Sequence, residues 1–459
     1  MKRINKKWIV LIAIILVAGI FLALALGSNT ELKEKNNGRV SYGTVLVLIL
    51  AVAIPILLIA LTCVIAFVKD KNPTGAQTAQ AAENEALSSQ VAPEGETEET
   101  GERFCMLKEI DQNKESYRQK SYDKTVTLEE LCNNFRNYAA SQLRLYYDEA
   151  DIRRFIAGMA VSHILILQGM SGTGKTSLAH AFGSFIDNSS TIVPVQPMWK
   201  ERSDLIGYYN EFTKKFNETL LLEKMYEANY SEDMYITVLD EMNIARIEYY
   251  FAEFLSLLEL PNPDERYIDI VSDKWENDPK QFKDGRLKLP PNMWFIGTAN
   301  NDDSTFAISS KVYDRAMIMD LDTKSERYTA PKTEKIRISC EQFNKLVAEA
   351  QEEYSISKRN MKRIEAFDKY LIEHMHITFG NRIMKQIKTY IPVYVSCGGD
   401  ELEALDDILS KKVIRKLEAQ NPIYLRNSVD GLIEYMDELF GDDNMPMCKE
   451  YIRRIERNA

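Results

Sequence analysis

Residues His163 to Ala181 have the sequence HILILQGMSGTGKTSLAHA. The apolar run His163 to Leu167 has the length and flanking residues of a buried strand. Gly169 to Thr176 then matches the phosphate-loop pattern G-x-x-x-x-G-K-[ST], and Ser177 to Phe182 predicts the start of a helix. A glycine-rich turn before an ordinary helix is the alternative, but the order strand, glycine loop, helix favours a nucleotide site.

The loop carries the groups that a nucleotide phosphate requires. Its three glycines let the backbone curl so that N–H groups point at phosphate oxygens, and the helix start adds partial positive charge. Lys175 is placed to reach the β- and γ-phosphates, and the Thr176 hydroxyl to bind Mg²⁺. We therefore predict that the nucleotide is bound by nine consecutive residues: Gly169, Met170, Ser171, Gly172, Thr173, Gly174, Lys175, Thr176 and Ser177.

The residues that follow predict an α/β domain. Strand patterns alternate with helical ones, and around a phosphate loop this indicates a parallel sheet with helices on both faces. The expected strands are Thr191–Val195, Met234–Asp240 and Trp294–Thr298, and the expected helices are Glu211–Tyr226 and Tyr249–Leu260. Tyr267–Val271 and Arg286–Leu289 predict a hairpin insert, and Val312–Leu321 completes the alternation.

Polar residues end two of these strands. Asp240 and Glu241 close the strand that begins at Met234, and Asn300 follows the next long strand. We expect Asp240 to hold Mg²⁺ directly or through water, Glu241 to polarise the attacking water, and Asn300 to help orient that water. An acid pair at an exposed strand end is the alternative for Asp240 and Glu241.

Residues from about Leu165 to Leu321 resemble AAA+ ATPases of the dynein-related branch, which includes the MoxR, midasin and McrB-type proteins. The motifs that carry this resemblance are QGMSGTGKTS from Gln168, SDLIG from Ser203, VLDEMN from Val238, FIGTANNDDST from Phe295 and VYDRA from Val312. The resemblance implies a P-loop AAA+ sheet with a C-terminal helical lid. It also implies a homo-oligomeric, hexameric ring that hydrolyses ATP with Mg²⁺.

The same resemblance implies roles for three polar residues. Asn300 would be the sensor-1 residue, and Arg315 the arginine finger that reaches the γ-phosphate bound by the adjacent subunit. Arg382 would be the lid arginine that reads the nucleotide state, with an ordinary solvated arginine as the alternative. McrB-type GTPases carry an arginine that is missing from Ala299–Thr305, which favours ATP over GTP.

The N-terminal region predicts a membrane anchor. Residues 8–26 and 44–68 are apolar runs near the length that crosses a bilayer, so residues 1–70 are expected to form a transmembrane hairpin. A cleaved signal peptide is the alternative for the first run. Lys69 and Lys71 after the second run agree with a cytoplasmic ATPase domain. We expect a multi-pass membrane protein whose N-terminus and ATPase domain lie in the cytoplasm.

Composition bounds the other regions. Residues 71–103 are acidic and contain no aromatic residue, so they predict a disordered linker. Residues 104–160 predict a helical lead-in, 161–325 the AAA+ domain and 338–459 the helical lid. A formal net charge of −11 disfavours binding to nucleic acid. The six cysteines lack a C-x-x-C pair and indicate reduced thiols.

These observations predict a membrane-anchored AAA+ ATPase that couples ATP binding and hydrolysis to remodelling of a protein or complex at the cytoplasmic membrane face. An assembly switch or McrB-like defence NTPase that acts with an effector partner is the first alternative. A P-loop kinase and a nucleic-acid translocase are the others. The sequence does not identify the protein client or effector.

Overall fold

The computed structural model describes residues 102–118, 120–300, 305–322 and 324–458. The expected transmembrane hairpin, residues 1–70, and residues 71–101 of the expected acidic linker lie outside these ranges. Within the described ranges, no helix combines the length and the apolar composition needed to cross a membrane.

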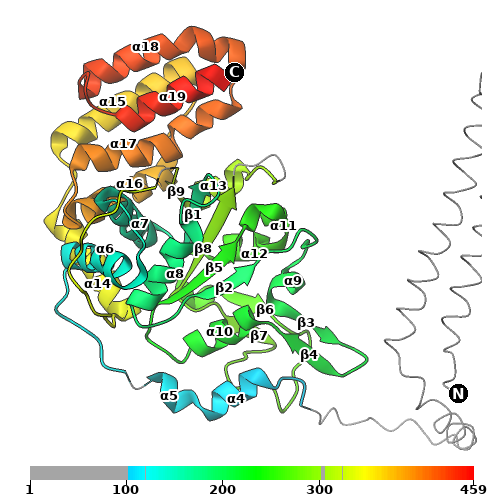
Figure 1. Cartoon of the computed structure of the whole chain (residues 1–459). Helices are drawn as coiled ribbons and strands as arrows, with labels where there is room; N and C mark the ends of the chain where they lie inside the picture. Colours follow the sequence, from blue (N-terminus) through cyan, green and yellow to red (C-terminus); the bar gives the residue numbers. More distant parts are fainter. Residues whose placement is uncertain (1–101, 119, 301–304, 323, 459) are drawn as a thin grey trace, which may run out of the picture. The chain divides into compact units, whose positions relative to one another are not determined.

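A five-stranded parallel sheet forms the centre of the described chain (Figure 1). Its spatial order is β2-β5-β8-β1-β9, and every neighbouring pair runs parallel. The strands are β1 (Ile164–Gly169), β2 (Thr191–Pro194), β5 (Tyr235–Asp240), β8 (Met293–Asn300) and β9 (Met317–Asp320). The apolar runs that predicted the strands after the phosphate loop therefore form a sheet of the expected kind.

Alternate residues of β1 enter two different hydrophobic cores. Leu165 and Leu167 pack with the phosphate-loop helix α8 (Lys175–Phe185), while Ile164 and Ile166 pack on the opposite face. Successive strand residues point to opposite faces, so a strand that is apolar at every position is covered on both sides. The first core also contains α6 (Leu128–Leu143) and α7 (Glu149–Val161). The second contains α10 (Leu220–Ala228), α11 (Ile247–Tyr250) and α12 (Ala252–Leu257).

The expected helix over Glu211–Tyr226 is wrong in its first half. The chain instead forms an antiparallel hairpin of β3 (Gly207–Asn210) and β4 (Lys215–Glu218), and α10 begins only at Leu220. The Asn210 side chain accepts hydrogen bonds from the N–H groups of Phe212 and Thr213, which stabilises the turn. Phe216 stacks on Phe104 with ring centroids 4.9 Å apart. Turn chemistry and a distant aromatic contact thus override the helical pattern.

Two shorter predictions fare better. The hairpin insert is confirmed as β6 (Tyr267–Asp269) paired with β7 (Arg286–Lys288). The helix expected over Tyr249–Leu260 is present but divided, because α11 ends at Tyr250 and α12 begins at Ala252. Other short elements are α9 (Arg202–Ile206), η1 (Met242–Ile244), η2 (Pro263–Glu265) and α13 (Ser310–Arg315).

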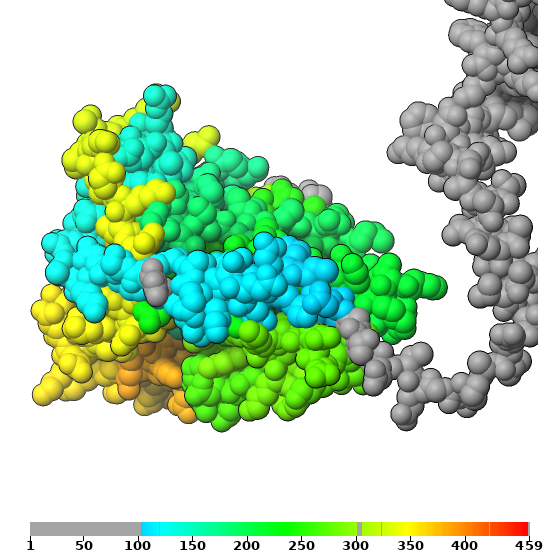
Figure 2. Space-filling view, turned by 90° about the horizontal axis from the view of Figure 1, so that it is seen from below, coloured from blue at the N-terminus to red at the C-terminus, as the bar shows by residue number. Residues whose placement is uncertain are grey.

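The lead-in is helical, as expected. It contains α4 (Met106–Gln112), α5 (Lys114–Arg118), α6 and α7. Seen from below, its first part (blue to cyan) lies across a face built from residues in the range 200–290 (green) (Figure 2). Arg103 anchors it there, since its guanidinium lies 2.6 Å from Asp278 and 4.4 Å from the ring centroid of Trp275.

Helices alone make up the C-terminal region from Cys340. They are α14 (Cys340–Glu353), α15 (Lys358–Met375), α16 (Gly380–Ser396), α17 (Glu401–Lys412), η3 (Ile414–Ala419), α18 (Pro422–Phe440) and α19 (Pro446–Asn458). Apolar residues of this lid belong to the same core as α7 and α8. The lid therefore packs, mainly through α16, on the helices α6 and α7 that cover one face of the sheet (Figure 1).

Candidate nucleotide site

The phosphate loop connects the end of β1 to the start of α8. Gly172 and Gly174 have φ angles of +79° and +96°, which side chains with a Cβ rarely adopt. A Cβ on Gly169 would lie 2.4 Å from the carbonyl oxygen of Leu321, so the loop also needs a glycine there for steric reasons. The glycine pattern in the sequence therefore has a local structural cause at each of its three positions.

Lys175 lies along this loop. Its side chain is buried, and Nζ donates hydrogen bonds to the carbonyl oxygens of Gly169 at 3.0 Å and Met170 at 2.6 Å. These contacts place a positive charge beside the backbone groups that would surround a phosphate. The first residue of α8 thus supplies the cation at the helix N-terminus.

Thr176 and Asp240 meet at the carboxyl edge of the sheet. Thr176 Oγ1 lies 2.7 Å from Asp240 Oδ1, and the hydroxyl of Thr298 donates to the same oxygen at 2.8 Å. A hydroxyl and a carboxylate converging from two elements form a donor set of the kind that Mg²⁺ uses, because this ion retains several waters and needs few protein ligands. The two predicted metal ligands are therefore close enough to share one ion.

Thr298 is a site residue that the sequence reasoning missed. It lies on β8, and its hydroxyl oxygen accepts a hydrogen bond from the backbone N–H of Glu241 at 2.9 Å while donating to Asp240. One buried hydroxyl thus orients both acidic residues. The available signal was its position two residues before Asn300, on a strand that ends at the same edge.

Glu241 and Asn300 complete this edge. Glu241 is exposed and has a φ of +53°, an uncommon backbone conformation for a residue with a side chain and one that often occurs at functional sites. Asn300 is aligned with Gly169 on the neighbouring strand. Together with Asp240 they lie where three adjacent parallel strands end, which is the usual ligand-binding edge of such sheets.

Arg315 and Arg382 lie at the opposite edge. Arg315 lies at the edge where the strands begin, because its carbonyl oxygen accepts a hydrogen bond from the hydroxyl of Ser162, just before β1. Seven residues of nearly extended chain separate Ser162 from Gly169, a span of about 20 Å. The structure therefore does not bring either arginine to the phosphate loop of its own chain.

Both arginines instead contact Glu259. Arg315 Nε lies 2.7 Å from Glu259 Oε2, and Arg382 Nη2 lies 2.5 Å from Glu259 Oε1. They line a cavity of about 670 Å³ together with Arg266 and Lys385. The ordinary charges of these side chains give four cations against one carboxylate, so the cavity is suited to an anion.

His163 borders this cavity but adds no positive charge at neutral pH. Burial, assisted by the nearby Arg266 charge, lowers its pKa to about 4. The cationic character of the cavity therefore comes from its arginine and lysine residues.

Two exposed aromatic residues of the domain lie away from this cavity, on the β3–β4 hairpin. Phe212 at its tip is 99% exposed and Tyr208 is 52% exposed. Tyr209 packs edge-on against Trp275, and Trp199 against Tyr250, so these two are structural. Phe212 was missed because it lies within the segment expected to be helical.

Comparisons with known proteins match two regions of the chain. Residues 164–316 match the family model of the AAA domain (dynein-related subfamily), and residues 334–459 match DUF8727, a domain of unknown function. A crystal structure of a protein named "putative ATPase" from Cytophaga hutchinsonii is 15% identical, with a TM-score of 0.45. That match covers 72% of this chain and 98% of the other. No curated protein matches.

The central region is thus an AAA domain of the dynein-related subfamily, followed by a lid that matches a separate family. The AAA domain implies nucleotide binding. Its loop, its Asp240 and its Asn300 occupy one edge of the sheet, while Arg315 and Arg382 occupy the other.

The Thr298 hydroxyl gives a testable expectation. Thr298→Val should raise the Mg²⁺ concentration needed for tight binding of a fluorescent ATP analogue by about 10–100-fold, as for other lost partners of metal ligands. Thr237→Val is the matched control, because Thr237 lies buried on β5 and its hydroxyl has no hydrogen-bond partner. Equal Mg²⁺ dependence in both variants would contradict the role given to Thr298.

Proposed function

We propose that this chain is an ATPase that assembles with copies of itself, using ATP and Mg²⁺ to remodel a protein or complex at a membrane. The observation that carries the proposal is that the phosphate loop and the arginine pair lie at opposite ends of the strands, about 20 Å apart along β1. ATP hydrolysis needs both the loop and cations that stabilise the charge on the transferred phosphoryl group. Two chains placed edge to edge would combine them.

The carboxyl edge supplies the residues that bind and activate. Bound Mg²⁺–ATP would bring the electrophilic γ-phosphorus and most of the local counter-charge. Lys175 would exchange its carbonyl partners for phosphate oxygens, and Thr176 with Asp240 would hold the ion. The Glu241 carboxylate accepts a proton from the attacking water, while the Asn300 amide orients that water.

The amino edge supplies the cations for a neighbour. Arg315 and Arg382 lie side by side on Glu259, and Arg382 is half exposed. A γ-phosphate presented by the next chain could contact both guanidinium groups. In this arrangement Arg382 serves the adjacent subunit, whereas the sequence-based expectation was a lid arginine that reads the nucleotide state.

A remodelling role is supported by the β3–β4 hairpin. The hairpin exposes two aromatic side chains, Tyr208 and Phe212, and so presents apolar surface to solvent. Phe212 at the hairpin tip therefore offers a contact for a client. An assembly switch that recruits an effector would need nucleotide-dependent association but little turnover.

The membrane part of the proposal depends on residues 8–26 and 44–68, whose apolar runs are near the length of a bilayer core. The ATPase domain would lie on the cytoplasmic side, where nucleotide is present. Residues 71–101 would tether it.

The shared site is tested by mixing two inactive variants. Lys175→Ala should lose ATP binding, whereas Arg315→Ala should bind ATP normally and lose about 10³–10⁵-fold in hydrolysis rate. A mixture should recover turnover, because the intact Arg315 of one chain serves the intact loop of the other. Full activity of Arg315→Ala alone, or of the wild type as a dilute monomer, would exclude the shared site.

The Glu241→Gln variant distinguishes a remodelling motor from an assembly switch. This variant should bind ATP and lose about 10²–10⁴-fold in turnover, because the base for the attacking water is gone. Cross-linked in cells, it should retain a client that the wild type releases, and the purified client should stimulate wild-type hydrolysis. Client binding that leaves hydrolysis unchanged would favour the switch.

The membrane anchor is tested by truncation. The full chain should sediment with membranes, and a chain that begins at Glu102 should stay in the supernatant and bind ATP. The cut must keep Arg103, since its ion pair with the buried Asp278 holds the lead-in to the domain. A full chain found in the supernatant would overturn the anchor, provided that its first 70 residues are intact by mass spectrometry.

A further inference from the structure

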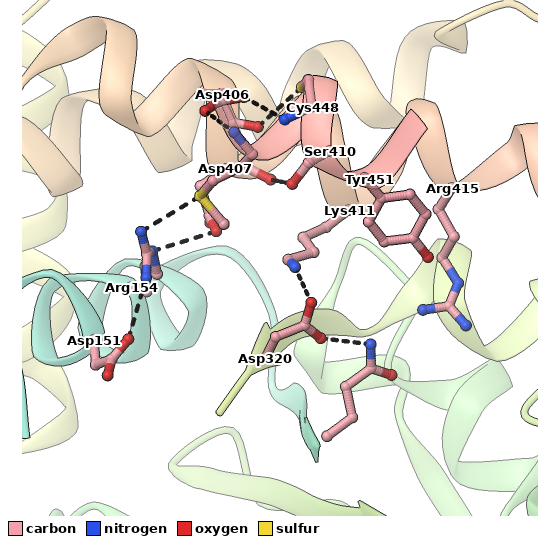
Figure 3. A network of polar contacts seen from close by, with 12 residues as sticks. Asp151, Arg154, Asp320, Asp406, Asp407, Ser410, Lys411, Arg415, Cys448 and Tyr451 are labelled. Carbon is pink, nitrogen blue, oxygen red and sulfur yellow. Dashed lines mark hydrogen bonds and ion pairs between the residues drawn. The ribbon is translucent and has the colours of Figure 1, made fainter. Parts of the chain in front are cut away.

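A buried polar network connects the lid to the last strand of the sheet (Figure 3). Lys411 on α17 forms an ion pair with Asp320, at the carboxyl end of β9. The other carboxylate oxygen of Asp320 accepts a hydrogen bond from Gln168 Nε2 at 2.6 Å. Gln168 is the residue that immediately precedes Gly169, so the network reaches the phosphate loop.

Both the nitrogen and the oxygen of the Gln168 side-chain amide form hydrogen bonds. Only 5% of the residue is exposed, and its Oε1 accepts a hydrogen bond from the hydroxyl of Tyr313 at 3.1 Å. A buried polar atom left without a partner costs about 1–3 kcal/mol. The amide therefore ties β1 to α13, and it does so at the residue next to the loop.

Tyr313 precedes Arg315 by two residues on the short helix α13. Its ring is covered by the Arg415 guanidinium, 3.3 Å from the ring centroid. Lys412 donates to the carbonyl oxygens of Tyr313 and Ala316, on either side of Arg315. The lid thus fixes the backbone on both sides of Arg315 through Lys412, while Gln168 accepts a hydrogen bond from the Tyr313 hydroxyl.

The state of the loop can change at this point. Lys175 Nζ contacts the carbonyl oxygen of Gly169, the residue after Gln168. If Lys175 turned toward phosphate oxygens, the Gly169 carbonyl would lose this donor, and Gln168 is the residue adjacent to that carbonyl. Gln168 is rigidly bonded, so a shift of β1 is passed to Tyr313.

We propose that Gln168 and Tyr313 are positioning residues whose hydrogen bond conveys the nucleotide state of one chain to the Arg315 that it offers to the next. The inference rests on the proposed function, because it requires that Arg315 act on a neighbouring site. In this proposal, Gln168 and Tyr313 do not touch the nucleotide. They set the order in which adjacent sites hydrolyse ATP.

The test uses one acceptor chain and two donor chains. The acceptor is Arg315→Ala, which has an intact loop but no finger. The donors keep Arg315 and differ in nucleotide state: Lys175→Ala is empty, and Glu241→Gln is loaded with ATP. With donor in excess, acceptor turnover per assembled complex should differ between the donors by at least about fivefold, the lower end of typical coupling between sites.

Adding Tyr313→Phe to both donors should bring this ratio to within about twofold of one. The substitution removes only the hydroxyl and keeps the ring that stacks on Arg415. Gln168→Met in the donors should have the same effect, because it removes the amide oxygen that accepts the hydrogen bond from Tyr313. Tyr451→Phe is the matched control, since its hydroxyl donates to Glu418 within the same region but does not contact Gln168.

A merely structural role for Tyr313 would behave differently. Tyr313→Phe placed in the acceptor should leave stimulation within about twofold, because that chain offers no arginine. Loss of turnover from both positions, or a donor ratio that Tyr313→Phe leaves unchanged, would overturn the inference and leave the shared site standing. Donors that fail to stimulate the acceptor at all would overturn the shared site and this inference together.

Discussion

The parallel direction of every strand in the central sheet is the constraint on which the site depends. Parallel strands place all their carboxyl ends at one edge, so the phosphate loop, Asp240 and Asn300 meet without any long-range design. The same rule sends whatever precedes a strand to the other edge. Arg315 lies just before β9, and it is therefore far from the loop of its own chain. The separation of the phosphate loop from Arg315 follows from strand direction.

Buried charges join the lid to this sheet. Burial would raise the pKa of Asp320, but the contact with Lys411 and the hydrogen bond from Gln168 hold it below its ordinary value. Burial lowers the pKa of Lys412 to about 7, although its ammonium is bonded to two carbonyl oxygens. Charged groups are rarely buried without such partners, because an unpaired buried charge carries a large desolvation cost. The lid is thereby fixed by specific polar contacts in addition to its apolar core.

The local parts of the fold and site were predictable from sequence, and the long-range parts were not. A glycine loop with lysine and threonine, followed by a strand that ends in Asp240, specifies its chemistry within a few residues. Thr298 acts through hydrogen bonds to two residues on another strand, which no local pattern encodes. The β3–β4 hairpin depends on Phe104, more than a hundred residues earlier. Arg382 lies beside Arg315 only because α16 packs next to α7, and a helix pattern does not reveal its packing partner.

The contacts of Glu259 suit the change of partners that the proposed shared site requires of Arg315 and Arg382. Arg315, Arg382 and Glu259 are all partly exposed, with side-chain exposures of 25%, 51% and 28%. Ion pairs in such positions contribute about 0–1 kcal/mol, because water screens them and long side chains lose freedom in forming them. A phosphate enclosed between two chains is screened less and accepts charge-assisted hydrogen bonds from both guanidinium groups. Glu259 therefore holds the two arginines together, and in the proposed assembly the neighbour's nucleotide would replace this weak partner.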